Sequence, residues 1–310
     1  MKLFKSTLAI LLALLMVFSL AACGGADDGN TDDGGKGGST KFEPTTIELD
    51  MCKINVLGAE KITDSEDKPA FRLWFDITNT TDETNYPSYF YEFSATQDGY
   101  ELTETYASYE STVPAAEVGF YNIRPTVTVR ACVEYNYKED GGTIIAGFNN
   151  YYSEEAPKTV EIDPQNFSGA PADEFTPEKV EDPLFLADYP AKGTYEAFGV
   201  KYDVSIDKFE ITEDFDGESI IRVYYTFKNN SEENQKFNLV FTPEAYQDGI
   251  QLHPGYPKEK VAEEDAYLEE VKPGDSITVA QCYELAGDSP VEVDLTDLFG
   301  TGVGVVYAVK

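Results

Sequence analysis

"ATQDGYEL" at residues 95–102 returns as "AYQDGIQL" at residues 245–252, 150 positions further along the chain. One ungapped offset that persists across about 65 positions indicates two copies of one domain, which we call copy one and copy two. Two further pairs of segments align at the same offset: "FRLWFDITNTTDE" (71–83) with "IRVYYTFKNNSEE" (221–233), and "TVTVRACVEY" (126–135) with "SITVAQCYEL" (276–285).

The repeated segments alternate between apolar and polar residues with the period of a β-strand. Leu73, Phe75 and Ile77 share one face of residues 71–79, and residues 221–229 show the same alternation. β-Branched and aromatic residues dominate these runs. The Asp-Gly pair inside each QDG phrase favours a tight hairpin turn. The sequence therefore predicts an all-β protein of two tandem antiparallel immunoglobulin-like β-sandwiches.

Beyond residue 135 the two copies align differently. "VEID" (160–163) matches "VEVD" (291–294) at a smaller offset, which predicts an insertion in copy one. A proline-rich stretch separates the copies and favours an extended linker. The predicted domains are, in chain order, a lipoprotein signal peptide (1–22), a flexible Gly/Asp tether (23–43), sandwich copy one (44–167) with the insertion (136–159), the linker (168–192) and sandwich copy two (193–310).

The N-terminus has the features of an export signal. Lys2 and Lys5 precede an apolar run over residues 8–20, which is shorter than the roughly 20 residues of a membrane span. Leu20-Ala21-Ala22-Cys23 resembles the lipobox of bacterial lipoproteins at all four positions. The resemblance implies cleavage before Cys23 and lipid attachment to its sulfur. We therefore expect a lipid-anchored protein on the extracytoplasmic side of a bacterial cell membrane.

Charge and cysteine content narrow the range of functions. The formal net charge is −34, and the sequence contains no basic patch of the kind that binds nucleic acid. The negative charge favours solubility or attraction to cationic partners. Besides Cys23, the chain has Cys52, Cys132 and Cys282, an odd number that does not form a full disulfide framework. A bridge between Cys52 and Cys132 stays open at this stage. No cysteine or histidine spacing predicts a metal site.

No motif indicates catalysis. His253 is the only histidine, so a Ser/His/Asp site would depend on one residue between turn-prone segments, and we interpret it as a loop side chain. "DFDGE" (214–218) contains half of a calcium loop and is interpreted as an acidic hairpin turn. We predict no catalytic residue, metal or cofactor. A carboxylate-based glycan hydrolase is the less favoured alternative, because an acid pair carries no sequence signature.

Aromatic residues supply the candidate contact sites. Trp74 and Tyr224 occupy equivalent positions and fall on the polar parity of their strands. They could stack against neighbouring arginines or form an exposed platform for a sugar or peptide. Tyr151 and Tyr152 lie in the predicted insertion, and amphipathic tyrosines at a loop tip favour an interface. All four are candidate contact residues.

Copy two contains four short motifs with the character of turns and strand starts: Asn229-Asn230-Ser231, Tyr246-Gln247-Asp248-Gly249 with Leu252, Val271-Lys272-Pro273-Gly274 and Pro290-Val291-Glu292-Val293. In these motifs copy two resembles a known family, the domain of unknown function 5067 of bacterial surface lipoproteins. The resemblance covers residues 193–310 well and 44–167 more loosely. It implies an immunoglobulin-like or telokin-like sandwich in exported lipoproteins and no catalytic residues.

Together these observations predict a non-catalytic envelope lipoprotein that displays two sandwiches for binding or shielding at the cell surface. Its expected partners are the membrane, through the lipid on Cys23, and an envelope protein, peptide or glycan that the sequence does not identify. The alternative is a ligand-free structural spacer or an accessory subunit of an envelope complex.

The lipid anchor is directly testable. Replacing the lipid acceptor, Cys23→Ala, should leave the precursor unprocessed or release the protein from the membrane fraction, because the thiol is the attachment point. Fractionation and mass spectrometry of the mature N-terminus measure both effects. An unmodified Cys23 in mature wild-type protein would show that the anchor is not lipid.

Overall fold

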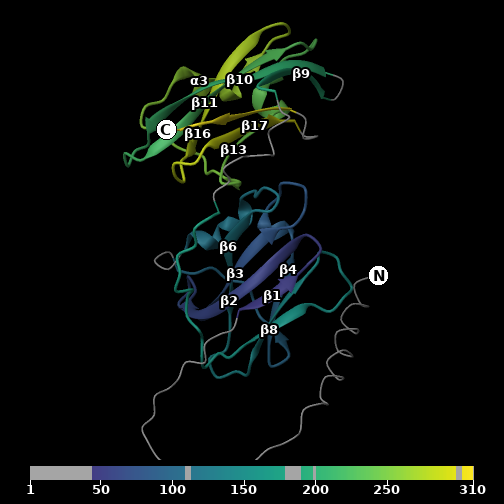
Figure 1. The fold of residues 1–310 in the computed structure, drawn as a ribbon, viewed down its shortest axis with the longest axis vertical. Helices are drawn as coiled ribbons and strands as arrows, with labels where there is room; N and C mark the ends of the chain where they lie inside the picture. The colour runs from purple at the N-terminus through teal and green to yellow at the C-terminus, as the bar shows by residue number, and fades with distance from the viewer. Residues whose placement is uncertain (1–43, 109–112, 179–189, 198–199, 298–301, 310) are drawn as a thin grey trace, which may run out of the picture. The chain divides into compact units, whose positions relative to one another are not determined.

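The computed structural model (Figure 1) contains two β-sandwiches joined in one chain, and residues 39–310 cluster as one compact unit. The predicted signal peptide and the whole of the predicted tether, including Cys23, lie outside the described residues. So does the middle of the predicted linker. The described residues are 44–108, 113–178, 190–197, 200–297 and 302–309.

Copy one consists of two four-stranded antiparallel sheets. The first has the strand order β1-β2-β3-β6 and comprises β1 (Thr45–Glu48), β2 (Cys52–Thr63), β3 (Pro69–Asn79) and β6 (Thr128–Asn136). The second has the order β5-β4-β7-β8 and comprises β4 (Glu92–Gln97), β5 (Tyr100–Glu101), β7 (Ile144–Asn149) and β8 (Lys158–Ile162). Among the residues that the structure describes, the connections contain the 3₁₀ turns η1 (Pro87–Tyr89), η3 (Pro114–Ala116) and η4 (Val118–Phe120).

Copy two repeats this architecture. Its first sheet, β16-β11-β10-β9, comprises β9 (Lys192–Ala197), β10 (Val200–Glu213), β11 (Ser219–Asn229) and β16 (Ser276–Glu284). Its second sheet, β14-β13-β17-β18, comprises β13 (Thr242–Gln247), β14 (Ile250–Gln251), β17 (Val291–Thr296) and β18 (Gly302–Tyr307). The connections contain the strand pair β12 (Gln235–Lys236) and β15 (Glu270–Val271), and the short helices α2 (Phe237–Val240), α3 (Ala262–Asp265) and η6 (Ala266–Leu268). The predicted class of two tandem all-β sandwiches is confirmed.

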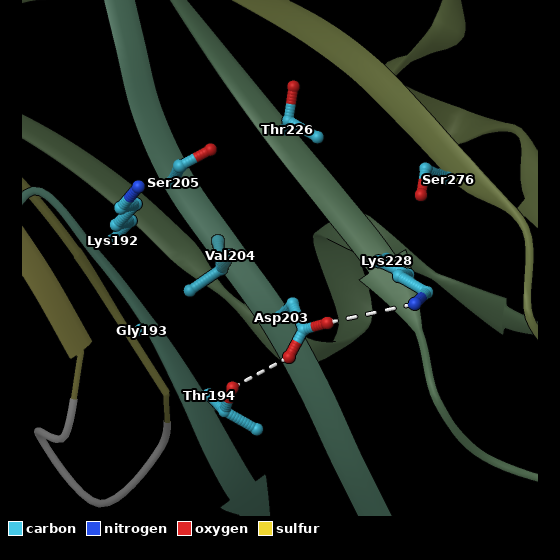
Figure 2. A pocket seen from close by; sticks show the side chains of 9 residues that line it. All are labelled: Lys192, Gly193, Thr194, Asp203, Val204, Ser205, Thr226, Lys228 and Ser276. Atoms are coloured by element: carbon cyan, nitrogen blue, oxygen red, sulfur yellow. Dashed lines mark hydrogen bonds and ion pairs between the residues drawn. The ribbon is translucent and has the colours of Figure 1, made fainter.

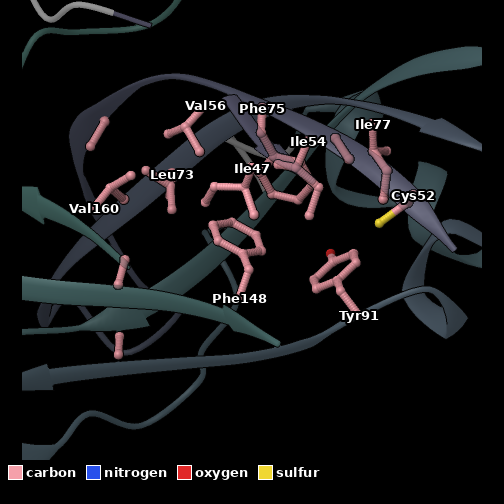
Figure 3. Packing of buried hydrophobic residues seen from close by; sticks show 14 of the residues in the cluster. Ile47, Cys52, Ile54, Val56, Leu73, Phe75, Ile77, Tyr91, Phe148 and Val160 are labelled. Carbon is pink, nitrogen blue, oxygen red and sulfur yellow. The ribbon is translucent and has the colours of Figure 1, made fainter. Parts of the chain in front are cut away.

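Each sandwich has its own apolar core. In copy one, Leu73, Phe75 and Ile77 of β3 are fully buried, as their shared face predicts. Figure 3 shows Phe75 and Ile77 in a cluster with Phe148 of β7 from the opposite sheet. Phe75 and Phe148 pack edge to face with ring centroids 5.4 Å apart. Burying a side chain of this size stabilises a fold by about 1.5–3 kcal/mol.

The predicted insertion at 136–159 is wrong, because strand pairing assigns different counterparts. Gln97 of β4 is opposite Ile144 of β7, and the repeat-equivalent Gln247 of β13 is opposite Val291 of β17. Strand β7 is therefore the counterpart of β17, and β8, which contains most of "VEID", is the counterpart of β18. Short strands of alternating valine and acid look alike in sequence, and only their pairing partners distinguish them.

The repeated QDG phrase has a structural role in both sandwiches. In copy one, Gln97 is buried and its amide Nε2 donates to the carbonyl oxygens of Lys138, at 3.0 Å, and Gly142, at 2.9 Å. The Lys138 amide donates back to Gln97 Oε1 at 2.9 Å. Asp98 and Gly99 form the turn with φ of 54° and 80°. One glutamine thus closes the loop that joins β6 in one sheet to β7 in the other.

The equivalent glutamine of copy two makes the same three hydrogen bonds to the β16–β17 loop. Gln247 Nε2 donates to the carbonyls of Gly287, at 3.1 Å, and Ser289, at 2.6 Å. The Ala286 amide donates to Gln247 Oε1 at 2.7 Å. The QDG phrase is therefore a clamp between the two sheets as well as a hairpin turn.

The three described cysteines, Cys52, Cys132 and Cys282, are free and buried, so the bridge left open by the sequence between Cys52 and Cys132 is not formed. Burial raises the pKa of each thiol to about 12. They remain protonated near neutral pH and act as small apolar side chains.

The clamp predicts a matched effect in both copies. Gln97→Ala and Gln247→Ala should each lower the free energy of unfolding by about 2 kcal/mol, because each removes three hydrogen bonds between a buried side chain and the loop. Chemical denaturation followed by circular dichroism measures the loss. Gln235→Ala, in the half-exposed β12, is the control and should change stability by less than about 0.5 kcal/mol. Equal stability of all three variants would contradict the clamp.

Candidate functional site

The sequence-based candidates Trp74 and Tyr224 are buried rather than exposed. Trp74 of β3 has 8% of its surface exposed, and its Nε1 donates to Glu60 Oε1 at 3.1 Å. The Arg72 guanidinium lies 5.5 Å from the centre of its ring. The arrangement is the stacked arginine pair considered as an alternative from the sequence, and it leaves little of the ring surface for a ligand.

Tyr224 occupies the equivalent place in copy two with a different cation over its ring. Its hydroxyl donates to Glu210 Oε1 at 2.9 Å, and Lys208 Nζ lies 4.2 Å from its ring centre. Arg222 instead pairs with Glu210 and with Glu264, 2.6 Å from its Nε. Trp74 and Tyr224 therefore belong to repeated ion clusters on the outer face of each first sheet, and they are not a binding platform.

The remaining sequence candidates for chemistry are engaged in structural contacts. His253 Nδ1 lies 3.0 Å from the Tyr121 hydroxyl, and the two rings stack with centroids 4.0 Å apart. In "DFDGE", Asp214 Oδ1 accepts from the amides of Asp216, at 2.9 Å, and Glu218, at 2.8 Å, and so closes the β10–β11 turn. Among the described residues, no group of three or more His, Cys, Asp or Glu side chains could hold a metal ion.

Tyr151 and Tyr152 lie on the β7–β8 loop and form an exposed aromatic cluster with Tyr89 of η1. The Tyr151 ring centroid lies 5.9 Å from that of Tyr152 and 5.9 Å from that of Tyr89. The Tyr151 hydroxyl donates to the Ser88 carbonyl at 3.1 Å, which ties the β7–β8 loop to η1. We call Tyr89, Tyr151 and Tyr152 the tyrosine patch.

Tyr152 is held outward by an unusual backbone conformation. Its φ is +58°, which costs a residue with a side chain about 1–2 kcal/mol. The surrounding turn is fixed by the Ser153 amide, which donates to the Asn150 carbonyl at 3.1 Å. The Asp50 amide donates to Asn150 Oδ1 at 2.9 Å and anchors the loop to the first sheet. Tyr152 is consequently 96% exposed.

The polypeptide around the tyrosine patch is acidic. The β7–β8 loop, residues 150–157, contains Glu154 and Glu155, and η4 follows Glu117. The Ser88 hydroxyl donates to the Gly119 carbonyl at 2.6 Å and places η4 beside η1. None of the three segments 86–92, 113–121 and 150–157 contains a lysine or arginine.

Family comparison agrees with this repeated architecture. The model of the family described as Domain of unknown function (DUF5067) matches residues 29–146 and 187–297, one match in each copy. The chain belongs to this family. The resemblance read from the copy-two motifs is therefore confirmed.

Two solved structures resemble parts of this DUF5067 chain. A candidate lipoprotein from Staphylococcus aureus subsp. aureus NCTC 8325 is 12% identical, with a TM-score of 0.29, covering 37% of this chain and 92% of that one. A protein from Enterococcus faecalis is 16% identical, with a TM-score of 0.30, covering 38% of this chain and 94% of that one. No curated protein matches the chain. Within the described parts of the chain, no helix is long and apolar enough to cross a membrane.

Copy two also has a shallow groove of about 530 Å³ on its first sheet (Figure 2). Thr194 Oγ1 donates to Asp203 Oδ1 at 2.7 Å, and Lys228 Nζ lies 3.9 Å from Asp203 Oδ2. Thr226 Oγ1 donates to Asp207 Oδ2 at 2.6 Å. These polar groups already have partners from their own sheet, so the groove is a weaker candidate than the tyrosine patch.

The buried position of the single tryptophan gives a direct optical test. Trp74 should emit at shorter wavelength than free tryptophan, and iodide should quench it weakly, because loops and ion pairs cover its ring. Steady-state fluorescence of the folded and the urea-unfolded protein measures both. Efficient iodide quenching in the folded protein would place Trp74 on the surface instead.

Proposed function

We propose that this chain is a non-catalytic, lipid-anchored protein of the bacterial cell envelope that binds a cationic partner through the tyrosine patch of copy one. Membership in DUF5067 and the lipobox ending at Cys23 support the envelope assignment. The observation that carries the binding function is the exposed cluster of Tyr89, Tyr151 and Tyr152 on one loop and turn.

The chemistry of the patch favours ammonium or guanidinium groups. The faces of tyrosine rings attract cations, and such a contact contributes about 0.5–1 kcal/mol at an exposed site. Glu117, Glu154 and Glu155 flank the rings without a competing base in the same segments. The net charge of −34 also raises the rate at which a cationic partner is encountered. An exposed basic peptide segment of an envelope protein fits these features.

The non-catalytic character rests on the state of the candidate nucleophiles and bases. The cysteine thiols have raised pKa values and are buried, and His253 is stacked against Tyr121. The glutamates in the repeated clusters, Glu60 and Glu134, are engaged by the single arginine Arg72 at 2.9 and 2.7 Å. These contacts support structural roles for the groups that sequence analysis could have assigned to catalysis.

A lysine-rich peptide is a suitable probe for the patch. Tyr152→Ala and Tyr89→Ala should each weaken its binding by about two- to fivefold, since each removes one ring face. Tyr152→Phe should retain affinity, because the ring remains. Isothermal titration at low ionic strength measures the change, and affinity should fall as salt is added.

The control for this experiment is Tyr256→Ala in copy two, where a tyrosine is 71% exposed outside the patch. It should leave the affinity unchanged. Binding that depends equally on Tyr256 would indicate attraction to net charge alone. If the wild-type chain does not bind the peptide, the tyrosine patch is not a cation site, and the alternative of a ligand-free spacer gains support.

A further inference from the structure

A second surface of this chain, separate from the tyrosine patch, joins copy one to copy two. Residues 121–124 run antiparallel beside β14, which is the end strand of its sheet. The Arg124 amide donates to the Gly249 carbonyl at 2.8 Å, and the Gln251 amide donates to the Asn122 carbonyl at 2.9 Å. The segment thus extends the second sheet of copy two by strand addition, a common mode of peptide recognition.

The side chain of Arg124 enters a pocket on copy two. Its guanidinium carbon lies 3.7 Å from the centre of the Tyr246 ring. Nη2 donates to Asp294 Oδ2 at 3.1 Å, and Nε is 3.6 Å from Glu292 Oε2. Tyr246 of β13 is directly opposite Glu292 of β17, so the three side chains lie on one face of neighbouring strands. We call Tyr246, Glu292 and Asp294 the acid–aromatic pocket.

The pocket requires a cation. Glu292 and Asp294 are 3% and 6% exposed, and burial raises the pKa of both carboxyl groups, that of Asp294 to about 6, while the charge of Arg124 opposes the shift. Within the described residues, Asp294 Oδ1 has no hydrogen-bond partner. Two buried carboxylates side by side are unfavourable unless a positive charge lies between them. Arg124, itself 5% exposed, supplies that charge.

Comparison of the two copies shows that this pocket is a specialised feature of copy two. At the equivalent pairing positions of copy one, Thr96 is opposite Ile145 and Ser94 is opposite Gly147. These residues offer neither an acid nor an aromatic ring. Copy one therefore has the same strands without the acid–aromatic pocket, and the shared fold does not require it.

The segment that fills the pocket is equally specialised. Besides its backbone bond, Asn122 donates from its own amide to Gln251 Oε1 at 2.9 Å and from Nδ2 to Glu244 Oε1 at 3.0 Å. Asn79 Nδ2 donates to the Ile123 carbonyl, and the equivalent Asn229 donates to the Val271 carbonyl, so Arg124 corresponds to Lys272 in copy two. Lys272 is exposed, whereas Arg124 is buried between the two acids. The buried cation is therefore a feature of copy one, and the pocket that receives it is a feature of copy two.

We propose that the acid–aromatic pocket is a binding site for an extended, arginine-bearing peptide segment, that residues 121–124 of the same chain fill it, and that this occupancy couples the two sandwiches. The proposal does not depend on the tyrosine patch or on its ligand. With the pocket filled, the two copies are held together by residues 121–124 as well as by the predicted linker.

The test displaces residues 121–124 from the pocket in the full mature chain and measures whether the same segment, added as a separate peptide, binds there. Arg124→Glu places a third acid against Glu292 and Asp294 and should displace residues 121–124 by repulsion. The probe is a fluorescent synthetic peptide with the sequence of residues 118–127. It should bind the Arg124→Glu chain at least tenfold more tightly than the wild-type chain, because the tethered segment competes at an effective concentration of about millimolar. Fluorescence anisotropy measures both affinities.

Three controls make the result specific. A peptide with alanine in place of its arginine should bind neither chain. Adding Glu292→Gln and Asp294→Asn to Arg124→Glu should abolish peptide binding. Arg130→Ala changes another arginine of copy one, which pairs with Asp76 at 2.8 Å outside the pocket, and it should bind the peptide no better than wild type.

Arg124→Gln provides a milder variant that removes the charge and keeps a polar, uncharged side chain, and it is decisive if Arg124→Glu does not fold. It should also bind the peptide more tightly than wild type. Equal peptide affinity for wild type and the folded variant would overturn the proposal, as would a folded variant that does not bind the peptide.

Discussion

The glutamine side chain of the QDG phrase holds the loop that joins the two sheets of each sandwich, and it does so in the same way in both copies. In both copies this one residue donates to two carbonyls and accepts one amide from the loop between the sheets. Gln97 and Gln247 are each 3% exposed, and a buried side-chain amide without such partners would cost about 1–3 kcal/mol. The phrase is retained across 150 positions because turn and clamp are both needed.

The two copies share this fold, and they differ in the side chains on the outside of each sandwich. Copy one presents the tyrosine patch, with Tyr152 held in a costly backbone conformation. Copy two presents the acid–aromatic pocket on β13 and β17, which Arg124 of copy one fills. The ion cluster around Arg72 is repeated around Arg222, so it belongs to the frame. Residues that are repeated in both copies are thus assigned to the structure, and residues that differ between the copies are the candidates for function.

Much of the frame could be predicted from the sequence, because strand periodicity is a local property. The buried face of β3 and the Asp-Gly turns follow from alternation and turn chemistry. The partner of a short strand does not, which is why the sequence alone pairs "VEID" with the wrong strand of copy two. Polar parity also did not mean exposure for Trp74. Segment 103–107 runs beside β6, with the Thr105 amide donating to the Glu134 carbonyl at 2.9 Å, and ion pairs cover the outer face of the first sheet.

The candidate sites depended more strongly on long-range contacts. The sequence identifies Tyr151 and Tyr152 as adjacent aromatic candidates, but Tyr89 is more than sixty positions away and joins them only through the contact of η1 with the β7–β8 loop. Two tyrosines around Pro87 in "YPSYF" are a signal that could have drawn attention to this turn. Arg124 carried no sequence signal, since its partners lie on the other copy.

The central claim is that the two copies share one sandwich fold but present different surfaces, and that residues 121–124 of copy one join the copies by extending the second sheet of copy two. Hydrogen exchange of the Gln251 amide, followed by NMR in the wild-type chain, tests it most directly. The Leu252 amide, which donates to Ala245 inside copy two at 2.8 Å, is the internal reference. The account predicts that Gln251, donating to Asn122 of copy one, exchanges about as slowly as Leu252. Rapid exchange at Gln251 beside slow exchange at Leu252 would show a free sheet edge and contradict the account.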